Sequence, residues 1–296
     1  MANESSNKSE LNVVTGAFGY TGKYIARRLL ADGIRVKTLT GHPERPNPFG
    51  AQVVAAPFNF DDLPTLIDQL SGASTLYNTY WVRFSRGEVT FDRAIENTRT
   101  LIQAAKDAGV GRIVHVSITN PSLNSSLPYF RGKAQVEEAI IDSGISYAII
   151  RPTVIFGIED ILINNIAWIL GRFPLFVVPG GGGYRFQPIF VEDLAGLAVD
   201  AGGQEDNLIL DAAGPETYTF DEFVRLVGQT MGSRTKIVHL PSALALGISK
   251  IVGYFLGDVV LTRDEITGLM SDLLVSDAPP AGNTSLKSWR PSMLPR

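Results

Sequence analysis

The sequence predicts an α/β protein with a doubly wound parallel sheet and a smaller C-terminal α+β annex. Apolar strand-like runs alternate with amphipathic helical patterns through the first half of the chain. A glycine-rich turn links the first strand-like run to the first helical pattern. After Arg151 and Pro152 the alternation weakens and proline and glycine become frequent, which indicates a change of architecture.

The first half contains alternating strands and helices. Several of the strands are continuous apolar runs, which is typical of parallel strands buried on both faces. The expected strands are Leu11–Thr15, Arg35–Leu39, Gln52–Ala55, Thr75–Asn78, Arg112–Ser117 and Tyr147–Ile150. The expected helices lie near Thr21–Asp32, Leu63–Leu70, Glu88–Ala108 and Pro128–Ser143.

The second half is expected to complete the sheet and to form the annex. A helix followed by a strand is expected between Val191 and Leu210, with Asp193 capping the helix. Thr262 and Glu265 have the spacing of a capping box at a helix start. The remaining expected elements are helices near Thr219–Met231, Ser242–Phe255 and Thr262–Leu274 and a strand near Lys236–Leu240.

Composition excludes several functional classes. The 296 residues are 45% hydrophobic and 19% charged, with a net charge of −4, which gives no support for nucleic-acid binding. The chain has no cysteine, which excludes disulfides and a thiol nucleophile, and its three scattered histidines do not indicate a metal site.

No targeting or membrane-spanning segment is expected. The polar first ten residues lack the features of a signal or transit peptide, so we expect a cytoplasmic protein. The longest apolar window, Ala243–Leu261, contains Lys250 and Asp258. We therefore expect a core or interface helix there, with peripheral membrane contact as an alternative to a membrane span.

The stretch Val13–Lys23 carries glycines at 16, 19 and 22 between a strand and a helix. The first glycine allows a sharp turn, the second lets the backbone approach a pyrophosphate, and the third lets the helix pack on the strand. Free N–H groups and the positive end of the helix dipole would hold the anion. The residues expected to contact the dinucleotide here are Gly16, Phe18, Gly19, Tyr20, Thr21 and Gly22.

This turn at the start of a βαβ unit predicts a Rossmann-type nucleotide domain. We divide the chain into a disordered N-terminus (1–10), an NAD(P)-binding domain (11–155), a mixed segment that completes the sheet and forms the substrate annex (156–277), and a loose tail (278–296).

Tyr129 and Lys133 are i and i+4 on an expected helix, so they share one face. A nearby ammonium would favour the phenolate and lower the pKa of Tyr129, which could then exchange a proton with a carbonyl or hydroxyl substrate. Lys133 could also bind the nicotinamide ribose. Ser117 ends a central strand, where its hydroxyl could donate to the same carbonyl.

Several segments together match the pattern of one family. They are Thr15–Gly22, Ser117, Tyr129–Lys133, Arg151–Gly157 and Gln187–Ala195. In this order they resemble the extended and atypical short-chain dehydrogenase/reductase superfamily, especially its NmrA-like members and the NADPH-binding accessory subunit of respiratory complex I. The resemblance runs from residue 11 to about 195 and is loose beyond.

The resemblance implies NADP(H)-dependent oxidoreductase or epimerase chemistry on a carbonyl or hydroxyl substrate. We expect a monomer or a homodimer. Tyr129 would be the acid/base, Lys133 its partner and Ser117 a substrate hydrogen-bond donor. Some members of this group bind nucleotide without turnover. The alternative is therefore a non-catalytic NADPH-binding regulator or assembly factor.

Cofactor choice depends on the end of the second strand. An acidic residue there would bind the ribose 2′-hydroxyl of NAD, but this chain has none. His42 and Arg45 could instead meet a 2′-phosphate, so we expect NADP(H), and Glu44 leaves NAD(H) open. The resemblance also places Asn78 and Pro152 at the cofactor.

Two further features, an acidic pair after the third strand and an aromatic segment after the fourth, each allow two interpretations. The resemblance places Asp61 at the adenine, whereas Asp61 and Asp62 could also cap a helix. The family usually has small residues in the segment Asn78–Phe84, but here it is aromatic. With Arg83 and Arg86, it is either a lid or substrate wall with an anion contact, or a surface loop tucked onto the core.

Overall fold

The computed structural model describes residues 10–85, 87–256 and 262–289, without the side chains of 250–256. The expected disordered N-terminus therefore falls, except for Glu10, outside the described residues. The same holds for Arg86, for Asp258 and for the end of the apolar window.

A seven-stranded sheet forms the centre of the molecule, in the order β11-β6-β5-β4-β1-β2-β3, with every neighbouring pair parallel. The strand order reverses between β1 and β4, so a crevice opens beyond their carboxyl ends, where ligands bind in open α/β sheets. The strands are β1 (Leu11–Thr15), β2 (Arg35–Thr40), β3 (Val53–Pro57), β4 (Thr75–Asn78), β5 (Arg112–Val116), β6 (Ser146–Pro152) and β11 (Leu208–Ala212).

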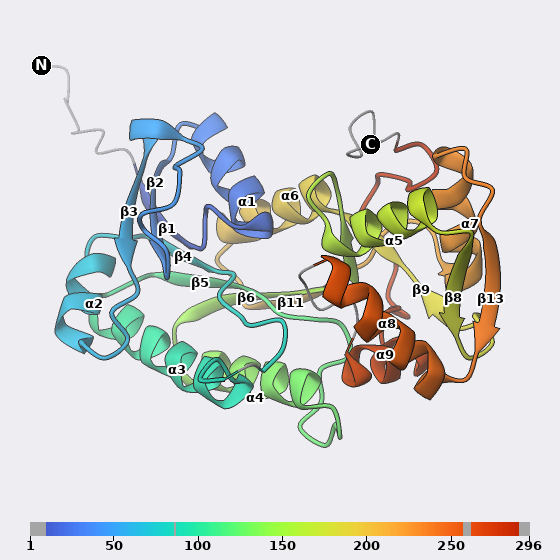
Figure 1. The fold of residues 1–296 in the computed structure, drawn as a ribbon. Coiled ribbons are helices and arrows are strands. Elements are labelled where there is room, and N and C mark those ends of the chain that lie inside the picture. Colours follow the sequence, from blue (N-terminus) through green and yellow to red (C-terminus); the bar gives the residue numbers. More distant parts are fainter. Residues whose placement is uncertain (1–9, 86, 257–261, 290–296) are drawn as a thin grey trace, which may run out of the picture.

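Helices cover both faces of this sheet (Figure 1), which confirms the doubly wound fold. On one face α1 (Tyr20–Ala31) packs beside α6 (Val191–Gly202) over a core that includes Val14 and Ile25. The other face carries a second core, which includes Val13 and Leu101. The helices there are α2 (Leu63–Leu70), α3 (Phe91–Asp107) and α4 (Pro128–Asp142).

The annex has its own aromatic core, in which Phe186 and Phe223 are fully buried with ring centroids 4.5 Å apart. Its strands form two-stranded sheets only. The annex elements are β7 (Val154–Phe156), α5 (Ile161–Arg172), β8 (Leu175–Pro179), β9 (Arg185–Phe186), β10 (Pro188–Phe190), β12 (Tyr218–Thr219), α7 (Phe220–Thr230), β13 (Lys236–Leu240), α8 (Ser242–Leu256) and α9 (Arg263–Met270).

Local hydrogen bonds explain where the element ends differ from the expected ones. Gln52 ends a short 3-10 turn, η1 (Gly50–Gln52), rather than beginning β3. The hydroxyl of Thr90 accepts from the Arg93 N–H at 3.1 Å, so α3 starts after residue 90 rather than at 88. The expected capping box of Thr262 and Glu265 is present, but α9 ends at Met270, shortly before Asp272 takes a positive φ of 55°.

The expected loose tail is wrong for residues 281–289, and so is the expected cap at Asp193. The Asp193 carboxylate lies within the first turn of α6 and accepts from the N–H groups of Asn283 and Thr284 at 2.8 and 2.7 Å. Trp289 then packs against the ring of Phe156, with centroids 5.5 Å apart. Residues 281–289 are therefore held in place by contacts with residues distant in the sequence, which local composition does not reveal.

Among the described residues, none of the helices is long and apolar enough to cross a membrane.

Candidate functional site

The glycine turn has the geometry that a dinucleotide needs. Gly16 has a positive φ of 67°, a conformation that a side chain disfavours, and its N–H donates to the Leu39 carbonyl at 2.7 Å. A Cβ at Gly22 would overlap the Gly16 carbonyl oxygen and lie 2.8 Å from the Gly16 carbonyl carbon. Gly19 is exposed, so the backbone is open to a ligand.

The N-terminus of α1 is prepared for an anion. Its cap residue is Gly19, no side chain caps the helix, and the first turn contains no acidic residue. The first N–H groups of the helix, from Tyr20 to Gly22, thus have no side-chain acceptor, and the helix dipole adds positive potential. A pyrophosphate fits this donor set. Phe18, which precedes the helix, is half-buried beside the turn.

Tyr20 contributes a side chain as well as its backbone. Its hydroxyl is buried and lies where a Cβ at Gly157 would come within 2.6 Å. Burial and the nearby Asp160 raise the pKa of Tyr20. The phenol therefore stays neutral and packs against Gly157 in the loop after β7.

His42 and Arg45 lie on the exposed loop that follows β2. The His42 imidazole is 3.3 Å from the Glu44 carboxylate, and the Thr40 hydroxyl accepts from the His42 N–H at 3.2 Å. The Arg45 side chain is exposed to solvent. This loop follows the strand next to β1, which is where the adenosine ribose of a dinucleotide lies in such folds.

Asp61 and Asp62 have separate roles. Asp62 caps α2, because its carboxylate accepts from the Thr65 N–H at 3.2 Å, as the helix-cap interpretation predicted. Asp61 is exposed and forms an ion pair with Arg93 at 3.1 Å. Its expected contact with adenine stays a prediction.

Asn78, at the end of β4, is buried in a polar network. Its amide oxygen accepts from the Thr15 hydroxyl at 3.2 Å and from the Tyr80 N–H at 3.0 Å, and its amide nitrogen lies 3.2 Å from His115. Burial lowers the pKa of His115, so the imidazole is neutral. Asn78 therefore joins β1 and β4 at the crevice.

Pro152, at the end of β6, is buried, and its carbonyl accepts from the Thr119 N–H at 2.9 Å. It shapes the crevice wall through its backbone.

Lys133 has an unusual environment. Its side chain is buried, its ammonium donates to the Val116 carbonyl at 2.9 Å, and it lies 4.7 Å from the centroid of the Trp81 ring. Burial lowers the pKa of Lys133 to about 7. Trp81 can reach this position because Gly132 has no Cβ, which would lie 3.0 Å from the indole.

Ser117 faces a carboxylate rather than an open pocket. Its hydroxyl donates to the Glu137 carboxylate at 2.5 Å, and Glu137 is in turn held by Arg151 at 2.6 Å. Ser117 and Glu137 are both about 4% exposed. In this arrangement the serine hydrogen is committed to Glu137 and not to a substrate.

The pKa of Tyr129 moves in the direction opposite to the expected one. Burial and the nearby Glu265 raise it to about 12, while Arg83 acts the other way. The Lys133 ammonium does not lower it, because that ammonium is turned towards Val116. At neutral pH Tyr129 is thus a neutral phenol that can donate a hydrogen bond.

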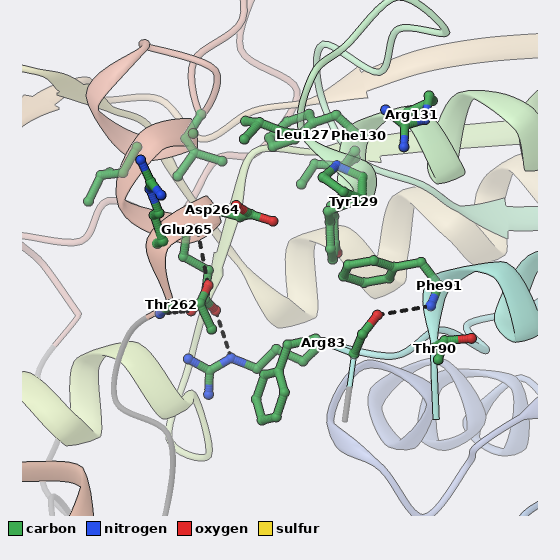
Figure 2. Close-up of a pocket in the computed structure, with 18 of the residues that line it drawn as sticks. Arg83, Thr90, Phe91, Leu127, Tyr129, Phe130, Arg131, Thr262, Asp264 and Glu265 are labelled. Carbon is green, nitrogen blue, oxygen red and sulfur yellow. Dashed lines mark hydrogen bonds and ion pairs between the residues drawn. The ribbon is translucent and has the colours of Figure 1, made fainter. Parts of the chain in front are cut away.

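Tyr129 lines a pocket of about 770 Å³ between the Rossmann-type domain and α9 (Figure 2). Its ring meets Phe91 edge to face at 5.8 Å, and Arg83 pairs with Glu265 at 2.9 Å across the pocket. The structure therefore brings the aromatic segment after β4 to the pocket as a wall. Arg83 is paired there rather than presented as a lone anion contact.

Three residues of this region were not expected from the sequence to act at the site. Trp81 covers Lys133, Glu137 accepts from Ser117, and Glu265 raises the pKa of Tyr129. One signal was available, since Glu137 follows Lys133 by four residues and shares its helix face. The described residues include no group of three acidic, histidine or cysteine side chains that could hold a metal ion.

Known proteins resemble this chain over most of its length. NADH dehydrogenase [ubiquinone] 1 alpha subcomplex subunit 9, mitochondrial, from Arabidopsis thaliana is 24% identical over 292 residues, which cover 92% of this chain and 73% of the relative. Photosystem II assembly factor Ycf39 from Cyanidium caldarium is 25% identical over 248 residues, which cover 82% and 78%.

A solved structure has the same fold. The NADPH complex of the NADPH-dependent quinone oxidoreductase from Escherichia coli superposes with a TM-score of 0.72 at 21% identity, covering 90% of this chain and 92% of the other.

The family model described as NAD(P)H-binding matches residues 16–158. This segment is therefore a domain of the NAD(P)H-binding family, and the resemblance of the chain to extended and atypical short-chain dehydrogenases/reductases of the NmrA-like kind is confirmed.

Proposed function

We propose that this protein binds NADP(H) and retains it without turnover, as an accessory or assembly protein. The observation that carries the proposal is the state of the expected catalytic groups. The Lys133 ammonium is bound to the Val116 carbonyl beneath Trp81, and the Ser117 hydroxyl is bound to Glu137. Without their support, a phenol with a pKa of about 12 is a poor acid/base near neutral pH.

The residues present fit the dinucleotide. The turn from Gly16 to Gly22 would hold the pyrophosphate, and Lys133 would exchange the Val116 carbonyl for the nicotinamide ribose hydroxyls. The bound nicotinamide supplies hydride chemistry in enzymes of this fold. Here, Ser117 and Tyr129 would shape its surroundings without moving a proton.

Two of the similar proteins are named as a respiratory-complex subunit and an assembly factor, which supports a protein partner for this chain as well. A cytoplasmic location and a monomeric or homodimeric state stay predictions.

We expect Arg45→Ala to weaken NADPH binding about tenfold and to leave NADH binding unchanged, because a charge-assisted hydrogen bond to the 2′-phosphate contributes about 1.5–3 kcal/mol and exposure reduces it. Calorimetric titration of both nucleotides measures this. The control is Arg35→Ala, an exposed arginine at the start of β2. Equal losses for NADPH and NADH in the Arg45 variant would contradict the expected NADP(H) preference.

The retention of NADPH gives the direct test. Purified protein is loaded with NADPH, freed of excess and mixed with a panel of ketones, aldehydes, quinones and nucleotide sugars. We expect bound NADPH fluorescence to persist for hours, with no oxidation above the rate in buffer. Oxidation that follows enzyme concentration with any member of the panel would overturn the proposal.

A second candidate is an NADP(H)-dependent oxidoreductase or epimerase, favoured by the position of Tyr129 on a ligand-sized pocket. Under this alternative, NADPH binding would bring Lys133 towards Tyr129. Tyr129→Phe would then remove turnover and leave NADPH binding nearly intact, whereas under our proposal it changes neither.

A further inference from the structure

A second pocket, the annex pocket, lies where α5 and α7 end and the neighbouring strands β8 and β13 begin. These two strands lie on the side of the annex away from the central sheet (Figure 1). The annex pocket has a volume of about 790 Å³ and shares no lining residue with the pocket beside Tyr129. It therefore belongs neither to the glycine turn nor to the site described above.

The charges that line the annex pocket are all positive. They belong to Arg172, Arg234 and Lys236, which are exposed, and none of the described lining residues is acidic. Within the described part of the chain these three cations form no ion pair. The whole chain has 26 basic and 30 acidic residues, so its average composition does not explain the cluster. The annex pocket therefore has a local potential that attracts anions.

Hydrogen bonds join the two loops that bound the annex pocket. Thr235 Oγ1 lies 2.9 Å from the Leu170 carbonyl oxygen and 2.8 Å from that of Phe173. Ser233 Oγ donates to the Leu170 carbonyl at 2.6 Å. Carbonyl oxygens would repel an anion, but these two face hydroxyl donors. The annex pocket is thus already formed and suited to an anion.

Exposed apolar side chains accompany the cations. Residues 171–175 are all exposed, and the exposed fractions of Phe173 and Leu175 are 38% and 50%. The Phe173 ring centroid lies 5.7 Å from that of the half-buried Trp168, and the Arg172 guanidinium lies 4.8 Å from the Trp168 centroid. A small soluble anion in the annex pocket would leave these apolar side chains in water, so it would not use this part of the surface.

We propose that this face of the annex docks on an anionic phospholipid surface. The three cations would meet lipid phosphates, and one headgroup would enter the annex pocket. Phe173 and Leu175 would enter the boundary between headgroups and acyl chains, with Trp168 at the depth of the headgroups. A lipid surface is the occupant that uses both the positive potential and the exposed apolar side chains.

Flotation of the full chain with extruded vesicles tests the docking. The vesicles contain phosphatidylcholine alone, or phosphatidylcholine with about one third phosphatidylserine. We expect binding to the phosphatidylserine vesicles at low salt, loss of this binding at high salt, and no binding to phosphatidylcholine alone. The result should be the same with and without NADPH, because the annex pocket lies apart from the glycine turn. Equal binding to both kinds of vesicle, or binding to neither, would overturn the inference.

Two double variants with the same change of charge locate the contact. Arg234→Gln combined with Lys236→Gln should weaken vesicle binding about ten- to thirtyfold, because each cation near an anionic surface strengthens binding about fivefold. Arg99→Gln combined with Lys106→Gln, at two exposed positions on α3, should leave binding unchanged. Urea unfolding checks that both variants fold. Equal weakening by the two pairs would assign binding to net charge and refute the site.

Fluorescence quenching tests the insertion of the apolar side chains. Phosphatidylserine vesicles whose acyl chains are brominated near the headgroup should quench part of the tryptophan fluorescence. Trp168→Phe should remove the quenched part, since the other two tryptophans, Trp81 and Trp289, do not line the annex pocket. Vesicle binding without this quenching would contradict the insertion.

Soluble competitors distinguish a lipid surface from other anionic partners. Glycerophosphoserine carries the same headgroup without acyl chains, and polyglutamate represents an acidic protein segment. We expect neither to displace the protein fully from the phosphatidylserine vesicles at low salt. Full displacement by glycerophosphoserine would identify a soluble phosphate ligand, and full displacement by polyglutamate an acidic protein partner. Either result would overturn the proposal.

Discussion

Gly22→Ala is expected to lose NADPH binding and stability together. The added Cβ would overlap the Gly16 carbonyl oxygen, which is backbone and cannot swing away, so the turn must shift. Overpacking of this kind costs about 1–3 kcal/mol, which exceeds the gain of about 0.5–1 kcal/mol from replacing glycine by alanine in a helix. Because the shift also moves the N–H groups that would hold the pyrophosphate, NADPH should bind about ten- to hundredfold more weakly.

Urea unfolding and calorimetric titration of NADPH measure the two effects. Gly183→Ala is the matched control, because a Cβ there meets nothing within 4 Å and the residue does not need a positive φ. If Gly22→Ala bound NADPH as the wild type does, the turn would not be the pyrophosphate site.

Lys133→Met is expected to stabilise the protein at pH 7 and to weaken NADPH binding. A lysine whose pKa falls to about 7 on folding destabilises the folded protein at pH 7, and a methionine of similar length removes that penalty, worth about 1–4 kcal/mol. The gain is reduced by the lost hydrogen bond to the Val116 carbonyl, worth about 1 kcal/mol. Loss of the ribose contact should weaken NADPH binding about tenfold.

The stability difference between Lys133→Met and the wild type should depend on pH. Burial lowers the pKa of Lys133 to about 7 in the folded protein, from 10.5 in the unfolded chain. Between these values the unfolded chain binds a proton that the folded protein lacks, so the stability of the wild type rises with pH, by at most about 1.4 kcal/mol per pH unit. The advantage of Lys133→Met should therefore be greatest at pH 7 and shrink towards pH 10.

Unfolding free energies from urea titrations at pH 7, 8, 9 and 10 test this. Lys106→Met, in the exposed last turn of α3, is the control and should show a constant difference from the wild type. A constant difference for Lys133→Met as well would mean that the lysine is charged throughout, contrary to the lowered pKa.

The sheet and the glycine turn could be predicted because their signals are local. Glycines at 16, 19 and 22 determine the conformation of the backbone around them. The alternation of apolar runs with helical patterns is by itself enough to predict a parallel sheet. The helix that carries Tyr129 and Lys133 follows from the same local pattern.

The directions of the polar side chains could not be predicted, because distant residues decide them. The position of the Lys133 amine depends on Trp81, which lies in the loop after β4 and covers it. The hydroxyl of Ser117 turns to Glu137 because Arg151 on β6 holds that carboxylate in place. The pKa of Tyr129 depends on Glu265, which the annex supplies.

The contacts of residues 281–289 with Asp193 and Phe156 determine when parts of the protein can complete their folding during synthesis. During synthesis, Asp193 is made about ninety residues before Asn283 and Thr284, so its carboxylate stays hydrated until their N–H groups can donate to it. Trp289 packs against Phe156 only after that stretch of chain has also left the ribosome. The contacts of α6 and β7 with residues 281–289 therefore form last, at the end of synthesis.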